Sequence, residues 1–367
     1  MCLVGGMLAI GLYSGRVMLV DEATREVKWE VQAHSLHSHP NVAMSPGTGR
    51  FVVSVGLHDE HWTLWDSASG AVHSVGARHD GTGACICEFN NLGHGLFQEG
   101  CPVLAHTKGV YAVAFSGQRL ATGGLDDAII LWDAQTGEAE RRLQGKGGEH
   151  SALSFSATGA WLAHGNADGS IDVWNATTGA LLRSMQLAHD YAVLSLSFSP
   201  DSCSLASVSG ALQVRSWEVN SGEMIRSLAG CRMFAAFSPD GRAIATANAS
   251  SAFDVQLLDQ KTSAVKLRMV GHTGKVNTGS FSVDGGSKLA SGSHDGTCRV
   301  WDSSTGALLR TIFVGNPVHS VSWGRDWVQY TQQRAMAFAM GHHPRLGVGS
   351  RVLELEVGVV QMILDRV

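Results

Sequence analysis

A Trp-Asp pair, or a close variant of it, recurs along the chain at a nearly constant interval. The copies stand at Val20-Asp21, Trp65-Asp66, Trp132-Asp133, Trp174-Asn175, Trp217-Glu218, Leu258-Asp259 and Trp301-Asp302. From residue 132 onward the spacings are 42, 43, 41 and 43 residues. A period of roughly 40 to 45 residues is expected for a unit of four β-strands. The chain is therefore predicted to consist of repeated all-β units.

The stretch from Gly271 to Asp302 shows what one unit contains. Its three short apolar segments are Val276–Phe281, Leu289–Ser293 and Thr297–Trp301, and turns rich in Gly, Asp and Ser separate them. Segments of this length between such turns predict an antiparallel meander. Gly-His opens the unit and Trp-Asp closes it.

The flanks of the repeat are shared between copies as well. Residues 176–183, Ala-Thr-Thr-Gly-Ala-Leu-Leu-Arg, are nearly duplicated at 303–310 as Ser-Ser-Thr-Gly-Ala-Leu-Leu-Arg. On these motifs, roughly residues 7–323 resemble the WD-repeat family of β-propellers. The resemblance implies an all-β propeller with four strands in each blade.

The two ends of the repeat predict how the ring closes. The first copy has segments for its second, third and fourth strands, Met7–Leu12, Val17–Val20 and Glu26–Val31, but none for its innermost strand. Val318–Trp323 is a surplus first strand. Propellers of this family usually complete one blade from both termini, which leaves no open edge at the seam. We therefore expect seven blades, although Ala335–Met340, Arg351–Glu356 and Val359–Leu364 could complete an eighth.

Length and composition set the domain organisation and exclude two classes of partner. We expect a propeller over residues 1–323, with an insertion at 76–100, and a C-terminal extension over 324–367. Only 16% of residues are charged, the formal net charge is −5, and no Lys/Arg run occurs, so nucleic acid is not an expected partner. No apolar stretch is long enough to span a membrane. The seven scattered cysteines favour reduced thiols in an intracellular compartment, cytoplasmic or nuclear.

The family resemblance also implies a buried hydrogen-bond relay in each blade. It runs from a His before the first strand, through a Ser or Thr and an Asp, to the Trp of the third strand. Two copies keep the full set: His106, Thr122, Asp126 and Trp132, and His272, Ser291, Asp295 and Trp301. In the other copies Lys146 replaces the His, Ala211 the Asp, or Leu258 the Trp. We expect blades three and seven to be the most rigid.

His, Asp and Ser also form hydrolase triads, but here the set recurs in each blade and ends on a Trp. No Gly-x-Ser-x-Gly elbow accompanies it. We therefore predict a protein without catalytic residues or cofactor. The insertion places residue types that zinc prefers within 23 residues, at His79, Cys85, Cys87, His94 and Cys101. The Cys-x-Cys spacing is unusual for zinc and Ala84–Phe89 fits a buried strand equally well, so these remain weak metal candidates.

A propeller of this family resembles a rigid platform, and the leading hypothesis is a scaffold that binds a peptide or protein, as a monomer or as a subunit of a larger complex. The family's contact face maps here onto Tyr111, Tyr191, Lys275, Asn277, His58 and His294, with Gly109, Leu125 and Leu194 nearby. A ubiquitin-ligase substrate receptor is one alternative, although Ala68, Gln135, Thr177 and Ser304 stand where those receptors often carry Arg or Lys. A metal-dependent propeller enzyme is the alternative from another class.

Overall fold

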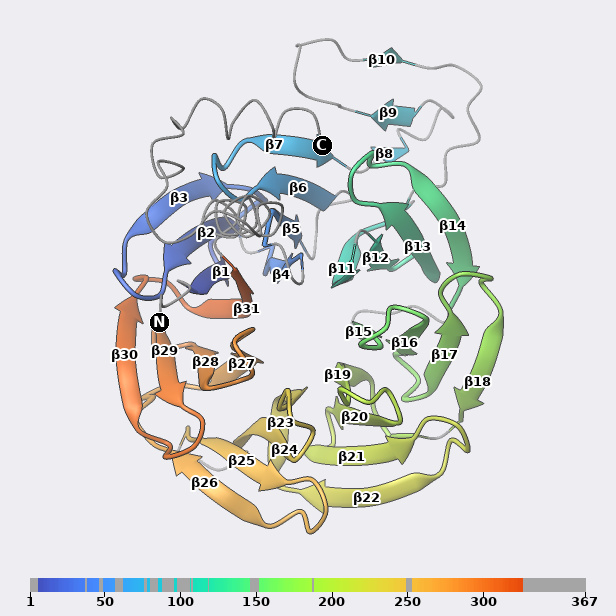
Figure 1. Ribbon diagram of the computed structural model, residues 1–367. Coiled ribbons are helices and arrows are strands. Elements are labelled where there is room, and N and C mark those ends of the chain that lie inside the picture. The colour runs from blue at the N-terminus through green and yellow to red at the C-terminus, as the bar shows by residue number, and fades with distance from the viewer. Residues whose placement is uncertain are drawn as a thin grey trace, which may run out of the picture.

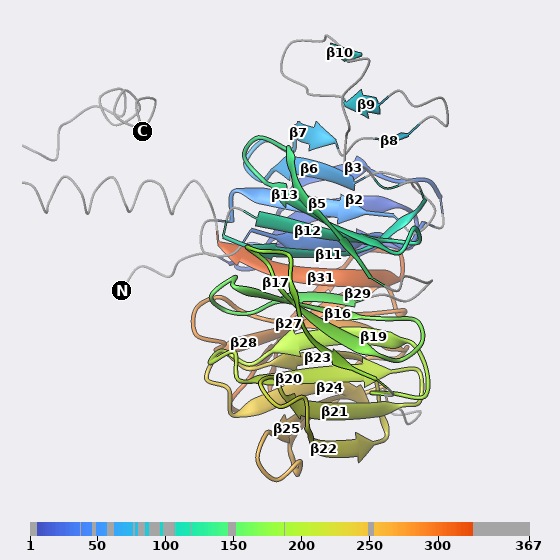
Figure 2. The ribbon, with the colours of Figure 1, turned by 90° about the vertical axis from the view of Figure 1, so that its right-hand side faces the viewer.

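The computed structural model describes residues 6–36, 38–45, 49–56, 62–75, 78–79, 85–87, 96–97, 106, 108–117, 119–145, 152–186, 188–248 and 253–325. Seven four-stranded antiparallel sheets are arranged as the blades of a ring (Figure 1). Seen from the side, the ring is a disc (Figure 2). The described residues form strands and turns and contain no helix. The predicted all-β, seven-bladed propeller is therefore confirmed.

The blades are numbered in chain order, and the strands of each blade are given from the innermost to the outermost. Blade one consists of β31 (Val318–Arg325), β1 (Gly6–Leu12), β2 (Arg16–Asp21) and β3 (Val27–Gln32). Blade two consists of β4 (Asn41–Met44), β5 (Phe51–Val55), β6 (Trp62–Asp66) and β7 (Val72–Val75). Blade three consists of β11 (Val110–Ser116), β12 (Arg119–Gly124), β13 (Ala128–Asp133) and β14 (Ala139–Gln144). The chain segment that connects blade two to blade three contains a small three-stranded sheet, formed by β8 (Arg78–His79), β9 (Cys85–Cys87) and β10 (Leu96–Phe97).

The remaining four blades show the same strand order. Blade four consists of β15 (Ala152–Phe155), β16 (Trp161–Gly165), β17 (Ile171–Asn175) and β18 (Leu181–Met185). Blade five consists of β19 (Val193–Phe198), β20 (Ser204–Ser209), β21 (Gln213–Glu218) and β22 (Met224–Ala229). Blade six consists of β23 (Cys231–Phe237), β24 (Ala243–Asn248), β25 (Val255–Asp259) and β26 (Val265–Met269). Blade seven consists of β27 (Val276–Phe281), β28 (Lys288–Ser293), β29 (Thr297–Asp302) and β30 (Leu308–Phe313).

The ring is closed by its two terminal strands, as predicted. β31 pairs antiparallel with β1, from Gly6 opposite Arg325 to Leu12 opposite Val318. β31 thereby becomes the innermost strand of blade one and is not available to start an eighth blade. It begins where the sequence predicts and extends two residues further. The tail segments considered for an eighth blade lie outside the described residues.

The apolar core is divided among the seven seams of the ring. Each of seven clusters of described buried residues joins two adjacent blades. At the closing seam, Val300 and Ile312 of blade seven pack with Leu8 and Ile10 of blade one. Each blade therefore buries both of its faces, which is the reason for the nearly continuous apolar runs on the second and third strands.

Hydroxyl groups on the innermost strands satisfy the backbone of the neighbouring blade. The N–H groups of Val42 and Met44 in blade two donate to Ser320 Oγ and Ser322 Oγ in blade one, at 3.0 and 3.1 Å. Equivalent bonds join Phe198 to Ser154, Ala235 to Ser195, Phe237 to Ser197, Val321 to Thr278 and Trp323 to Ser280. Since an innermost strand is the edge of its sheet, these N–H groups face away from their own blade. This explains why Ser and Thr alternate with apolar residues there.

The Asp of the Trp-Asp pair builds the turn that follows the third strand. Asp302 Oδ1 accepts the N–H groups of Ser304 and Thr305, at 2.9 and 2.8 Å. The corresponding Asp or Asn at 66, 133, 175 and 259 accepts the same two backbone bonds. Such Asx turns place the chain for the outermost strand. Hydrogen bonds from Ser304 and Thr305 lower the pKa of Asp302 to about 2.

A buried carboxylate reinforces the closing seam. Glu22, in the turn between β2 and β3 of blade one, is 1% exposed. Its two oxygens lie 2.6 Å from Lys288 Nζ and 2.7 Å from Arg310 Nε, both of which belong to blade seven. This ion-pair triad fastens the first blade to the last near the outer end of their interface.

Candidate partner-binding face

Among the described residues, two blades contain an unbroken hydrogen-bond relay. In blade three, His106 Nδ1 lies 2.8 Å from Asp126, and His106 Nε2 lies 2.8 Å from Thr122 Oγ1. Trp132 Nε1 donates to the same Thr122 oxygen at 2.7 Å. In blade seven the corresponding three distances among His272, Asp295, Ser291 and Trp301 are each 2.8 Å. The hydrogen bonds therefore link all eight relay residues that the sequence singles out.

The protonation states of Asp295 and His272 explain which group donates in each hydrogen bond of the blade-seven relay. Burial alone would raise the pKa of Asp295, but hydrogen bonds from Thr297, His272 and the Thr273 N–H outweigh it and lower the pKa to about 2. Burial also lowers the pKa of His272, against the opposing effect of Asp295. A neutral imidazole protonated on Nδ1 can donate to the carboxylate while Nε2 accepts from the serine hydroxyl. Every donor in the chain then has an acceptor.

Sequence reasoning missed one further relay segment, in blade two. His34 Nε2 lies 2.9 Å from Ser54 Oγ, which also accepts a 2.9 Å bond from Trp65 Nε1. The hydroxyl residue stands eleven positions before its Trp here, but ten before it in blades three and seven. Because of that one-residue difference, the repeat pattern did not predict this relay, although Asp59 stands six positions before Trp65 as the pattern requires. Asp59 itself lies outside the described residues.

In blades four and five the described residues form only part of the relay. In blade five, Ser207 bonds both His189 and Trp217, at 2.6 and 2.8 Å, without an Asp. In blade four, His164 occupies the position of the Ser or Thr, and the buried Trp174 Nε1 has no hydrogen-bond partner among the described residues. Burial lowers the pKa of His164 to about 4, so its ring is neutral at physiological pH. Lys146, at the His position of this blade, lies outside the described residues.

Each complete relay ties together two loops on the same side of the disc. His106 precedes the first strand of blade three, whereas Asp126 lies in the turn between its second and third strands. His272 and Asp295 have the same positions in blade seven. We call this side, formed by the loops before the first strands and the turns between second and third strands, the loop face. The relay in each of these two blades therefore connects the two kinds of loop that form the loop face.

Of the predicted partner-binding residues, three are exposed on the loop face. Tyr191 is 63% exposed in the loop before β19, and Lys275 and His294 are exposed in blade seven. Leu125 and Leu194 are partly exposed, Gly109 is buried, and His58 lies outside the described residues.

Tyr111 and Asn277 are buried, at 6% and 7% exposure, so the expectation that they present contact area on the loop face needs correction. The cause is a bulge: between Val110 and Ala112, and between Val276 and Thr278, the first strand carries one residue more than its partner strand. A bulge redirects the side chain of the extra residue. Asn277 Nδ2 instead donates to the Val318 carbonyl across the closing seam, at 2.7 Å.

Four aromatic side chains that the sequence analysis did not group together meet on the loop face. Tyr13 lies in the turn between β1 and β2, with ring centroids 4.1, 4.9 and 5.3 Å from those of His39, His294 and His319. The Tyr13 hydroxyl lies 2.9 Å from His294 Nε2. We call these four residues the histidine cluster. They come from blade one, the loop before blade two, and blade seven, so sequence spacing gives no indication that they meet.

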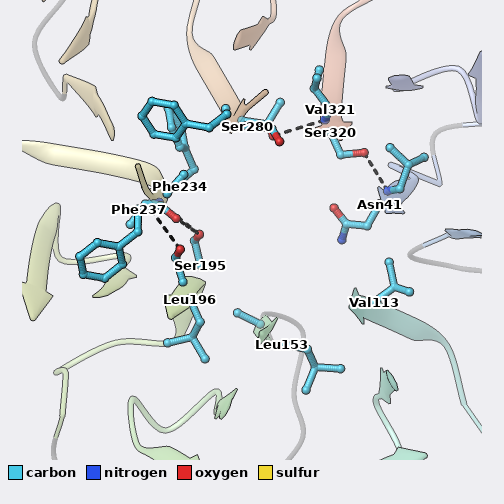
Figure 3. Close-up of a pocket in the computed structure, with 18 of the residues that line it drawn as sticks. Asn41, Val113, Leu153, Ser195, Leu196, Phe234, Phe237, Ser280, Ser320 and Val321 are labelled. Atoms are coloured by element: carbon cyan, nitrogen blue, oxygen red, sulfur yellow. Dashed lines mark hydrogen bonds between the residues drawn. The ribbon is translucent and has the colours of Figure 1, made fainter. Parts of the chain in front are cut away.

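The central cavity of the ring is a separate feature. It has a volume of about 630 Å³ and is lined by the first strands of the blades, with Asn41, Ser195 and Ser280 among its polar residues and Phe234 and Leu153 among its apolar ones (Figure 3). No charged or histidine side chain lines it among the described residues.

Three of the five weak metal candidates fall on described strands. His79, Cys85 and Cys87 fall on β8 and β9, and His94 and Cys101 lie outside the described residues. Within the described part of the chain, no three His, Cys, Asp or Glu side chains are grouped to hold a metal ion. The described residues also form no helix that could cross a membrane.

The comparisons with known proteins agree with the fold. The family profile described as WD domain, G-beta repeat, matches residues 101–133, 138–175, 179–218 and 264–302. A solved structure of the computationally designed Ika8 protein superimposes with a TM-score of 0.60 over 86% of both chains, at 22% identity, which shows the fold alone.

Three curated relatives match shorter parts of the chain. Protein tipD of Dictyostelium discoideum is 32% identical over 129 residues, which are 34% of this chain and 20% of that protein. Nuclear distribution protein PAC1 of Arthroderma benhamiae is 29% identical over 136 residues, 34% of this chain and 30% of that protein. WD repeat-containing protein 1 of Xenopus tropicalis is 26% identical over 215 residues, 55% of this chain and 28% of that protein. The chain thus spans less than a third of the length of these relatives.

Three of the four segments that match the family profile run from the outermost strand of one blade through the first three strands of the next. The blades outside the profile repeat the same four-stranded order around the same ring. Sequence and fold together therefore support a WD-repeat β-propeller, with four segments that match the family profile and seven blades of the same four-stranded order.

Proposed function

We propose that this propeller is a non-catalytic scaffold that binds a peptide or protein partner on its loop face. The observation that carries this proposal is the coupling of the relays to the loops: in blades three and seven, one buried imidazole connects both kinds of loop that form the face. Loops held in place before binding lose less conformational entropy when a partner docks. Exposed Tyr191, Lys275 and His294 supply an aromatic, a cationic and a polar contact there.

The structure gives the alternative functions less support. Ala68, Gln135, Thr177 and Ser304 use their backbone N–H groups inside the Asx turns, and none offers the cation expected of a ubiquitin-ligase substrate receptor. For a metal-dependent enzyme, titratable side chains would be expected in the central cavity, and none lines it among the described residues. We further propose an intracellular location, since Cys203, Cys231 and Cys298 are free thiols and one relative is named as a nuclear distribution protein.

Affinity capture with quantitative mass spectrometry tests the proposal. The full chain is compared with a loop-face variant, Tyr191→Ser with Lys275→Glu, and with a control variant away from that face, Leu182→Ser with Lys261→Glu. All four side chains are exposed, so both variants should melt within a few degrees of the natural chain. We expect the loop-face variant alone to lose the main partner. Equal capture by all three proteins would contradict a loop-face scaffold.

A further inference from the structure

Blade five lacks one member of its relay, while the other members are in place. Ser207 Oγ lies 2.6 Å from His189 Nε2 and accepts a 2.8 Å bond from Trp217 Nε1. Ala211 stands six positions before Trp217, where blades three and seven have an Asp. Blade five therefore keeps the histidine of the relay without the carboxylate that this histidine contacts in the two complete blades.

The turn that carries Ala211 has the same hydrogen bonds as the turn that carries Asp295 in blade seven. The N–H of Ala211 donates to the serine hydroxyl two positions earlier at 3.3 Å, and the N–H of Asp295 does the same at 3.1 Å. The next residue, Leu212 or Gly296, has a left-handed φ of 60° or 75°. Its carbonyl accepts an N–H from the residue after the outermost strand, at 2.9 or 3.0 Å. Ala211 Cβ thus stands where the Asp295 side chain begins.

The histidine of blade five is left with an unpaired donor. The hydroxyl hydrogen of Ser207 can reach His189 Nε2 at 2.6 Å or the Arg215 carbonyl at 3.5 Å, so it is donated to the imidazole. The neutral ring then carries its own proton on Nδ1. His189 is 1% exposed, and its Nδ1 has no hydrogen-bond partner among the described residues. Because a buried N–H without an acceptor costs free energy, this position favours an acceptor from outside the chain.

The charges beside this donor favour an anionic acceptor. Burial and the charge of Arg215 lower the pKa of His189 to about 4, against the opposing effect of Asp190, so the ring is neutral near pH 7. Arg215 donates to the Gln213 side chain at 2.8 Å and to the Ala188 carbonyl, and both acceptors are uncharged. Its buried Nε has no hydrogen-bond partner among the described residues. Asp190 is exposed and acts on the ring by its charge, without a hydrogen bond to Nδ1.

Blade three shows that a side chain can reach the carboxylate position from the outer edge of a blade. Arg142, on the outermost strand, lies 3.2 Å from the relay carboxylate of Asp126. In blade five the corresponding residue of the outermost strand is Ser227, which is exposed and pairs with Arg215. Because a serine does not fill the space that an arginine fills, the same approach is open in blade five.

Apolar side chains surround this approach on the loop face. Tyr191 is 63% exposed and Leu212 is 37% exposed. A Cβ on Gly210 would lie 3.4 Å from Tyr191 Cβ, so Tyr191 lies against the turn that carries Ala211. A partner that docks here therefore meets apolar contact area next to a buried donor and a cation.

We propose that blade five binds a segment of a partner protein whose Asp or Glu side chain takes the place of the missing relay carboxylate and accepts the His189 Nδ1 proton. An apolar neighbour in that segment packs on Tyr191 and Leu212. The proposal rests on the loop-face function and names the chemistry of its partner. A carboxylate suits the site because the same position holds one in blades three and seven, at 2.8 Å from the imidazole in both.

Selection of random short peptides displayed on phage, with the full chain as bait, tests the proposal. We expect the selected peptides to contain an Asp or Glu beside an apolar residue. In calorimetric titrations with the synthetic peptides, replacing that acid by its amide should weaken binding at least about tenfold.

One variant and a matched control assign the effect to the gap in the relay. Ala211→Asp supplies the carboxylate from the chain itself and should weaken binding of the same peptides at least about tenfold. Gly210→Asp places the same charge one residue earlier, at the position of the exposed His294 in blade seven, and should weaken binding by about threefold at most.

Thermal melts of the same variants test the site without a ligand. Ala211→Asp should raise the melting temperature by about 2–4 °C, because His189 Nδ1 gains its acceptor. Gly210→Asp should leave the melting temperature nearly unchanged. A lower melting temperature for Ala211→Asp would show that the position does not accept a carboxylate, and the proposal would be wrong.

Three other results would overturn the proposal. Selected peptides without an acid, or equal binding by the full chain and Ala211→Asp, would rule out a carboxylate in the relay. If no acidic peptide is selected but sodium formate raises the melting temperature of the full chain and not of Ala211→Asp, the site takes a free carboxylate and not a partner. If no acidic peptide is selected while partner capture still depends on Tyr191 and Lys275, the loop-face function stands without this ligand.

Discussion

Trp301→Phe and Trp174→Phe change the same position of the repeat in two blades, but they should have different effects on the free energy of unfolding. Trp301 is 1% exposed and its Nε1–H donates to Ser291, whereas Trp174 is 7% exposed and its Nε1–H has no partner among the described residues. The two residues occupy the same position of the repeat and both pack into an inter-blade cluster. The pair of substitutions therefore separates the hydrogen bond from the loss of volume.

The expected magnitudes follow from those contacts. Each Trp→Phe change leaves a small cavity that costs about 1 kcal/mol. Trp301→Phe also removes a hydrogen bond, worth about 1 kcal/mol, for a total near 2 kcal/mol. Trp174→Phe instead removes a buried unsatisfied donor, which recovers about 1–3 kcal/mol, so its net effect should be neutral or stabilising. The two variants should differ by about 2–4 kcal/mol.

Guanidinium denaturation followed by far-ultraviolet circular dichroism measures this difference without relying on tryptophan fluorescence. Trp301→Ala serves as the reference for loss of the whole side chain and should cost about 3–5 kcal/mol. Equal destabilisation by the two Trp→Phe variants would refute the assignment of the relay as a stabilising hydrogen-bond chain.

Three further predictions concern ring closure, the ion-pair triad at the closing seam, and blade four. Deleting residues 314–367 removes β31, leaves β1 with an open edge, and should abolish soluble monomer in size-exclusion chromatography; an equally stable truncated chain would refute closure through β31. Glu22→Gln leaves Lys288 and Arg310 without a counter-charge and should cost about 1–3 kcal/mol in thermal melts, whereas Glu138→Gln, at an exposed turn, should be neutral. Because the pKa of His164 is about 4 in the folded state and about 6.5 when unfolded, its stabilising effect should be lost as the pH falls from 6.5 toward 4. His164→Thr should flatten that part of the stability curve and provide an acceptor for Trp174; an unchanged acid limb would show that another group controls it.

The repeat period predicted most of the fold because each unit is defined locally. Trp-Asp marks the end of a third strand, and the surplus Val318–Trp323 segment had only one place in which to pair. Short turn motifs and alternating side chains suffice for this kind of inference, since a blade's own strands are consecutive in sequence.

The candidate site was only partly predictable, because it depends on bulges and on contacts across the seam. Tyr111 and Asn277 stand at the expected positions in sequence, but a single extra residue in each first strand turns them inward. Tyr13 and His319 are about 300 residues apart in sequence and meet only after the ring has closed. Neither a bulge nor a contact between the two ends of the chain leaves a periodic signal in one sequence.

Hydrogen exchange with mass spectrometry, on the full chain with and without its captured partner, tests the central claim most directly. A loop-face scaffold predicts that the partner slows exchange at the turn after β1, the turn between β28 and β29, and the loop before β19. The Asx turns at 133–138, 175–180 and 302–307 should exchange at unchanged rates. Protection of these Asx turns or of the insertion at 76–100, with the loop face unaffected, would contradict the account.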